Sequence, residues 1–140
     1  MKETYLDVTQ ESGRIFFTSD TVGPIVMLNL LRFKEIADFS SCPELNPESP
    51  ISGRECYKMY IKHTTLFLEE AGGQLLYFGN TQPYVIGPLE EKWDLMLLVK
   101  HTSKEEFLKF AINEEYLKII GYRTAALADS RLLPISNGKL

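Results

Sequence analysis

Hydroxyl-bearing side chains recur at helical spacing in one segment of the chain, where Tyr57, Tyr60 and Thr64 are three and four residues apart. Residues with this spacing lie on the same side of a helix. A tyrosine hydroxyl in such a position can donate a hydrogen bond to a ligand or take part in proton transfer. The same residues also fit a core stripe with bonded hydroxyls, so the sequence leaves both roles open.

A cationic side chain joins a later helical stripe, because Arg123 follows Tyr116 by seven residues, or two helical turns. A charge on an apolar stripe needs a partner. One interpretation is an ion pair with Asp94 or Asp129 that fixes the last helix to the sheet. The other interpretation is that the Arg123 guanidinium binds the carboxylate or enolate of a ligand, since it offers planar, bidentate donors.

An asparagine and the single tryptophan complete the candidate set. Asn29 is a poor strand former inside the apolar run 25–31, so its amide needs either neighbouring backbone partners or a polar cavity. Trp93 is either the wall of an apolar pocket or a large core or interface residue. The ligand-binding residues that the sequence predicts are Asn29, Tyr57, Tyr60, Trp93, Tyr116 and Arg123.

Motifs for metals, cofactors and nucleophiles are missing from the sequence. His63 and His101 lack a second histidine or a glutamate at metal-ligand spacing, and Cys42 and Cys56 form no CxxC pair. No nucleophile elbow, phosphate loop or dinucleotide fingerprint occurs. We therefore expect no cofactor, no metal and two reduced thiols, and we assign no catalytic residue.

The charge distribution limits the class of partner. Fifteen Lys and Arg against nineteen Asp and Glu give a net charge of -4, without a basic run that would follow phosphates or an anionic membrane surface. The chain has no apolar stretch of about 18 residues and no signal-peptide core near its first residue. We expect a cytoplasmic protein that binds neither nucleic acid nor membranes, with a possible small-molecule ligand.

Hydrophobic periodicity and helix-capping or turn residues predict the strands and helices that would position these side chains. Four apolar runs have strand character, at 25–31, 74–78, 93–99 and 131–135, with an interrupted hairpin between the second and third. Capping patterns at Ser52 and Ser103 begin two helices, of which the second breaks and restarts at Asn113. This order predicts an α+β, ferredoxin-like (βαββαβ) fold with a four-stranded antiparallel sheet and its helices on one face.

The predicted domain covers residues 23–135, after an N-terminal extension at 1–22 with a short helix and before a disordered tail at 136–140. The first and third strands are apolar on both faces, although helices would cover only one, so we expect a homodimer in which a second copy covers the other. The segment 34–51 has three prolines and little to bury. We expect it to reach toward the partner or the pocket mouth instead of packing into its own core.

An ordered set of short motifs runs through nearly the whole chain. Its members are the run Pro24-Ile25-Val26-Met27-Leu28-Asn29-Leu30, Phe33, Tyr57, Tyr60, Gly72-Gly73, Ile86-Gly87-Pro88, Trp93-Asp94, Tyr116 and Arg123. This set resembles the uncharacterised family called domain of unknown function 1330. The resemblance implies a dimeric α+β barrel, in which two ferredoxin-like sheets pack face to face. The long segment 34–51 and the N-terminal extension depart from the plain family pattern.

Two functions of different classes fit the sequence. The first is a non-catalytic, dimeric small-ligand-binding or accessory protein, whose polar residues mainly fix the fold. The alternative is a cofactor-independent enzyme, similar to a monooxygenase or isomerase, acting on a small apolar or aromatic acid. The enzyme requires Asn29, Arg123 and a tyrosine to converge on one cavity that solvent can reach.

Overall fold

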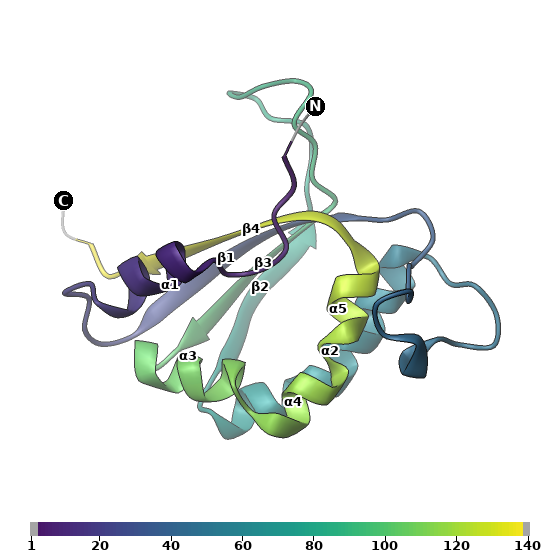
Figure 1. Cartoon of the computed structure of the whole chain (residues 1–140). Coiled ribbons are helices and arrows are strands. Elements are labelled where there is room, and N and C mark those ends of the chain that lie inside the picture. Colours follow the sequence, from purple (N-terminus) through teal and green to yellow (C-terminus); the bar gives the residue numbers. More distant parts are fainter. Residues whose placement is uncertain (1–2, 139–140) are drawn as a thin grey trace.

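The strands of the computed structural model, which describes residues 3–138, form one antiparallel sheet (Figure 1). They are β1 (Ile25–Phe33), β2 (Gln74–Asn80), β3 (Leu95–His101) and β4 (Leu127–Ser136). Their order across the sheet is β2-β3-β1-β4, and every neighbouring pair is antiparallel. The predicted ferredoxin-like α+β fold is confirmed.

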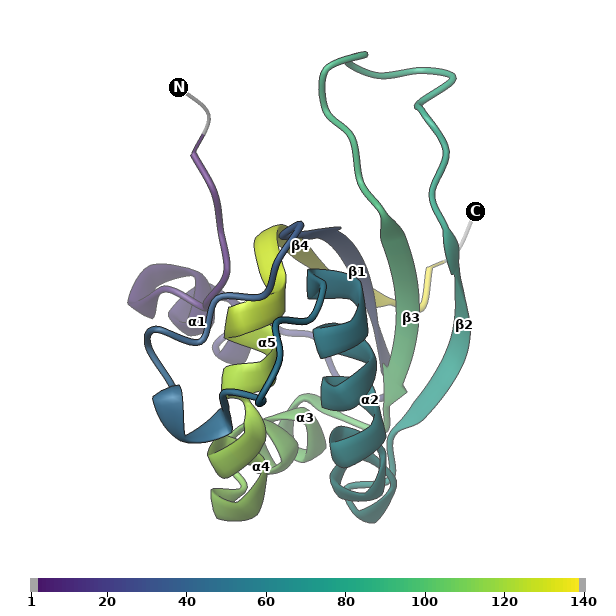
Figure 2. The ribbon, with the colours of Figure 1, turned by 90° about the vertical axis from the view of Figure 1, so that its right-hand side faces the viewer.

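The helices lie on one side of this sheet, as Figure 2 shows. They are α1 (Gln10–Phe17), α2 (Gly53–Glu70), α3 (Lys104–Ala111), α4 (Glu114–Ile119) and α5 (Gly121–Ala126), with a short 3-10 turn η1 (Pro43–Leu45) between β1 and α2. The predicted placement of the helices on one face is confirmed. The second predicted helix is in fact three short helices in succession, α3, α4 and α5, and Leu127 after them begins β4.

Side-chain caps begin the helices where the sequence predicts them. The Ser52 hydroxyl accepts from the Glu55 amide (3.0 Å) at the start of α2, and Ser103 accepts from Glu106 (3.1 Å) at the start of α3. Asn113 caps α4, so the predicted break and restart is confirmed. These caps satisfy amides that have no partner within their own helix.

Alternation along the strands divides the sheet into two faces. On the helix-covered face, Ile25, Met27 and Leu31 are buried. The other face, called the open face below, carries the half-buried apolar residues Val26, Leu28, Leu30, Met96 and Leu98. Cross-strand pairing places Leu28 opposite Leu98 and Leu30 opposite Met96. No helix of residues 3–138 covers the open face (Figure 2).

The segment 34–51 packs into its own core, so the prediction that it stays out of the core is wrong. Phe39 and Cys42 are 7% and 6% exposed and belong to the main core cluster. The Asp38 amide donates to the Ala125 carbonyl (2.9 Å), which fixes the segment against the end of α5. A Cβ on Gly121 would lie 2.9 Å from the Cys42 Cβ, which shows how closely the segment approaches α5.

The described N-terminal segment packs beside α3, and the described C-terminal segment pairs in the sheet. The predicted N-terminal helix is present as α1, and the Phe16 and Phe17 rings contact Phe107 of α3. At the other end, Ser136 pairs with Ile25 in the sheet and so belongs to β4 and not to a tail. The final residues of the predicted tail, 139–140, lie outside the described residues.

Residues 81–94, called the arm below, join β2 to β3 and project beyond the rest of the molecule (Figure 2). The predicted hairpin interruption corresponds to this segment, and Trp93 lies at its end and not in β3. Within residues 3–138, no helix is long and apolar enough to cross a membrane.

Candidate functional site

The predicted tyrosines form a packed cluster between α2, α4 and the sheet. Tyr57, Tyr60 and Tyr116 are 4%, 8% and 5% exposed, and the Tyr60 and Tyr116 hydroxyls share a hydrogen bond of 2.6 Å. Burial raises the pKa of all three hydroxyls. They stay protonated near neutral pH and are not proton acceptors there. Their geometry is that of core packing with bonded hydroxyls.

Arg123 is half-buried, but it is not paired with either predicted aspartate. Its Nη1 donates to the Leu6 carbonyl (2.6 Å) and its Nη2 to the Ser130 hydroxyl (3.3 Å). No carboxylate of residues 3–138 forms an ion pair with it. The prediction fails because the N-terminal segment lies beside β4 and offers a backbone carbonyl. Arg123 thus ties α5 to that segment and to β4.

Asp94 and Asp129, the two predicted partners of Arg123, bind other groups. Asp94 accepts from the Phe33 amide (2.8 Å) at the end of β1. Asp129 binds Arg32 and Arg131, as described below. Asn29 is also satisfied locally, since its Nδ2 donates to the Met27 carbonyl (3.3 Å).

The predicted set therefore does not converge on one cavity. Two open surface pockets occur, one at the base of the arm and one beside the segment 34–51. Neither is lined by Asn29, Tyr57, Tyr60, Tyr116 or Arg123. Trp93 is the one member of the predicted set that lines either of them, at the base of the arm.

The pocket at the base of the arm, called the arm-base pocket below, has a volume of about 270 Å³ and opens on the open face. Its apolar walls come from Leu30 of β1, Met96 of β3 and the rings of Tyr77 and Trp93. A small-molecule site typically combines such walls with a few placed polar groups. The second pocket, of about 240 Å³, lies beside Phe39 and Ile51 and has Glu48 as its one charged residue.

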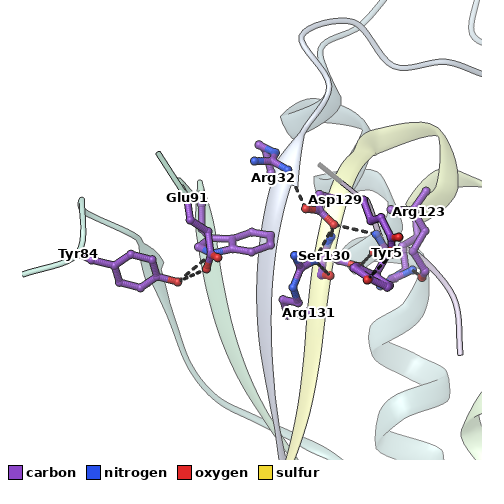
Figure 3. A network of polar contacts seen from close by, with 11 residues as sticks. Tyr5, Arg32, Tyr84, Glu91, Arg123, Asp129, Ser130 and Arg131 are labelled. Atoms are coloured by element: carbon purple, nitrogen blue, oxygen red, sulfur yellow. Dashed lines mark hydrogen bonds and ion pairs between the residues drawn. The ribbon is translucent and has the colours of Figure 1, made fainter. Parts of the chain in front are cut away.

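Three polar side chains of the arm-base pocket lie on the arm and are hydrogen-bonded to one another. The Trp93 Nε1 donates to the Tyr84 hydroxyl (3.0 Å) and to Glu91 Oε2 (3.1 Å), and Tyr84 donates to the same carboxylate oxygen (2.7 Å). This bond to Glu91 raises the pKa of Tyr84. These bonds join the three side chains to one another, and Figure 3 shows the one between Tyr84 and Glu91.

Two arginines share one buried aspartate (Figure 3), and both lie close to the Trp93 ring. The Arg32 and Arg131 guanidinium carbons lie 5.5 and 5.0 Å from the centroid of the Trp93 ring, within cation–π range. Each donates to Asp129 at 2.7 Å, one to each carboxylate oxygen. The Tyr5 amide adds a third donor at 2.8 Å.

The Asp129 carboxylate is 2% exposed. Burial alone would raise the pKa of Asp129, but hydrogen bonds from Tyr5 and Arg131 outweigh it and hold this pKa below its usual range. The group is therefore a fixed anion that joins the N-terminal segment, β1 and β4.

Sequence reasoning missed Arg32, Tyr84, Glu91, Asp129 and Arg131 as a group. A partial signal was present: Asp129 and Arg131 are two residues apart, and Arg32 continues the alternation of Leu28 and Leu30 on the open face. The arm residues carried no such period. Within residues 3–138, no group of three or more His, Cys, Asp or Glu side chains is placed to hold a metal ion.

His101 is the one described histidine enclosed by the core. It is 2% exposed, and its ring lies 4.9 Å from that of Phe107 and 5.8 Å from that of Phe110. Its Nδ1 has no hydrogen-bond partner among the described residues. Burial lowers the pKa of His101 to about 4.

This burial makes stability sensitive to mild acid. Above the ordinary pKa of 6.5, His101 is neutral in both states. Below it, the unfolded chain binds a proton that the folded chain refuses until pH falls to about 4. We expect the free energy of unfolding to fall by about 3 kcal/mol between those values. Urea titrations across this range should show a flatter dependence for His101→Leu and an unchanged one for the exposed His63→Gln.

Comparisons with known proteins agree with this fold. The chain is similar to the crystal structure of RPA0582, a protein of unknown function from Rhodopseudomonas palustris, with a TM-score of 0.86, 28% identity and coverage of 99% of this chain and 100% of that chain. The structure of methylated RPA0582 matches with a TM-score of 0.86 and 29% identity, and the match covers 97% of this chain and 96% of that chain. A dabb family protein with a ferredoxin-like fold from Mesorhizobium loti matches with a TM-score of 0.50 and 10% identity, over 84% of this chain and 99% of that chain. A match at this identity shows the fold alone.

No family profile and no curated protein matches the sequence. The fold and its neighbours therefore define a class, the ferredoxin-like α+β proteins. Within this class, the chain is similar over nearly its whole length to a protein whose function is unknown.

Proposed function

We propose that the protein is a non-catalytic small-ligand-binding protein of the dimeric α+β barrel type. In this proposal, the open faces of two copies pack together and the arm-base pocket holds the ligand. The observation that carries it is a pocket of about 270 Å³ on an apolar sheet face over which no helix of the described residues lies. The resemblance to domain of unknown function 1330 supports the dimeric form.

The open face has the composition of a surface that packs on a copy of itself. Its centre, on β1 and β3, is aliphatic, and its outer strands add Tyr77, Leu133 and Ile135, which are 61%, 57% and 40% exposed. Charged residues lie at its ends, where Arg32 and Arg131 are already bound to Asp129. An apolar centre with a polar rim is the usual anatomy of an interface, and a two-fold axis needs only one such surface.

The chemistry of the site favours binding over catalysis. The core tyrosines stay protonated near neutral pH, and Arg123 is held by Leu6 and Ser130. In the arm-base pocket, the Tyr84 hydroxyl already donates to Glu91, which raises the pKa of Tyr84. The walls of Leu30, Met96 and Trp93 suit a small molecule with an apolar or aromatic body.

Trp93 provides the test, because it is the single tryptophan of the chain and lines the pocket. We expect saturable changes in its fluorescence when small aromatic acids and their neutral analogues are titrated in. A compound at about one hundred times its dissociation constant should stabilise the fold by roughly 2.7 kcal/mol in thermal melts. Sedimentation of the same sample should show a dimer at micromolar concentration.

The matched variants are neighbours in β2. Gly79 lines the pocket, and the nearest atoms to a Cβ there belong to the Tyr77 side chain, at 3.5 Å and beyond. Gly79→Val should therefore fill space in the pocket without disturbing the backbone and should abolish binding. Phe78→Val, on the opposite face, should bind as wild type does. Equal binding by both variants would refute this pocket, and a monomeric wild type would refute the barrel.

A further inference from the structure

The tip of the arm is an apolar surface that no other part of residues 3–138 covers. Val85 and Ile86 are 100% and 94% exposed, and Leu89 is 75% exposed. No charged residue occurs from Gln82 to Leu89. Figure 2 shows that this segment extends away from the helices and beyond the ends of the strands. Exposed apolar groups gathered at one projecting point indicate a contact surface.

The arm presents this tip in a fixed shape. At its stem, the Thr81 amide donates to the Asp94 carbonyl (3.3 Å), and the Thr81 hydroxyl donates to the Trp93 carbonyl. Nearer the tip, Gly87 has a φ of +155°, and a Cβ there would lie 2.7 Å from the Tyr84 ring. Only glycine fits this close approach. A braced turn loses little conformational freedom when it binds, which favours a role in a contact.

A second copy of the chain is the occupant that the geometry favours. The arm continues β2 and β3, and Tyr84 and Trp93 at its base border the open face, so a copy packed there lies beside the arm. Five or six extended residues from Asn80 to the tip reach up to about 20 Å, whereas packed sheets are about 10 Å apart. The arm is long enough to cross to the second sheet. Pro83 and Pro88 lack the amides that strand pairing with an unrelated peptide would need.

We propose that, in the dimer, Val85, Ile86 and Leu89 of each arm pack on the partner copy as a reciprocal clasp. This inference rests on the proposed barrel dimer and adds a second contact to it. It also links assembly to the ligand site, because the same arm carries Tyr84, Glu91 and Trp93 of the arm-base pocket. Contact at the tip would hold the whole arm in place relative to the sheet, and with it the pocket wall that these three side chains form.

The test is the double variant Val85→Ser/Ile86→Ser, with dimer dissociation measured by sedimentation or by dilution of labelled protein. We expect the dissociation constant to rise by about tenfold or more, since both copies lose two buried aliphatic groups. Binding reported by Trp93 fluorescence should weaken in parallel at concentrations where the variant is monomeric. Urea unfolding of the monomer should not change, because both side chains are exposed in the single chain.

Val22→Ser is the matched control, because Val22 is 89% exposed in the segment between α1 and β1. It should dimerise as wild type does. If the double variant also dimerises as wild type does, the clasp is refuted while the open-face dimer stands. If the wild-type chain itself is monomeric, the proposed barrel fails and the clasp fails with it.

Discussion

Asp129→Ala is expected to lower the free energy of unfolding by about 3 kcal/mol. The substitution removes the one carboxylate that binds both Arg32 and Arg131, and it leaves the Tyr5 amide without its acceptor. The loss is large because Asp129 is 2% exposed, so water replaces its contacts poorly. Urea titration at neutral pH measures the change directly.

Two further variants separate charge from hydrogen bonding at this position. Asp129→Asn keeps an acceptor oxygen for Tyr5 but no anion for the arginines, so its loss should be intermediate. Asp38→Ala removes an exposed carboxylate whose ion pair with Lys34 is 3.8 Å long, and it should melt like wild type. Equal stability of Asp129→Ala and wild type would mean that the aspartate is dispensable for the fold.

The strands and helix starts were predictable because they depend on local signals. Alternation in the run 25–31 identifies β1 and shows that both of its faces are apolar, and the Ser52 and Ser103 side chains cap their own helices. Each of these features involves residues within a few positions of one another. Two right-handed crossovers then leave few ways to arrange four strands.

The partners of Arg123 were not predictable in the same way. Its guanidinium reaches the Leu6 carbonyl, 117 residues away in the sequence, and backbone carbonyls carry no sequence signature. A charge on an apolar stripe correctly indicated the need for a partner, but not that the partner would be neutral. The same limit applies to Asp129, whose third donor is the Tyr5 amide. Trp93 is the one predicted site residue that lines a pocket. It was predictable because large aromatic side chains are common both in pocket walls and in interfaces.

The segment that projects from the molecule is not the one that the sequence analysis expected to project. The sequence predicted that 34–51 would reach outward, and the structure shows that the arm at 81–94 projects instead. The segment 34–51 has three prolines and the arm has two, so the content of turn-forming residues does not separate them. What separates them is a set of backbone contacts, such as the bond from Asp38 to Ala125, that pull one segment into the core.

The core role of 34–51 leads to the second large effect, a loss of about 3 kcal/mol for Phe39→Ala. Phe39 is 7% exposed and its ring meets that of Tyr122 edge to face at 6.2 Å, so truncation leaves a cavity beside α5. Ile36→Ala is the control, since Ile36 is 57% exposed in the same segment and should cost little. Excision of residues 39–47 should destabilise the fold more than Phe39→Ala does, because it also removes Cys42 and Leu45 from the core cluster. Urea unfolding of the three variants measures this order, and an excised chain as stable as wild type would show that the segment only covers the core and does not build it.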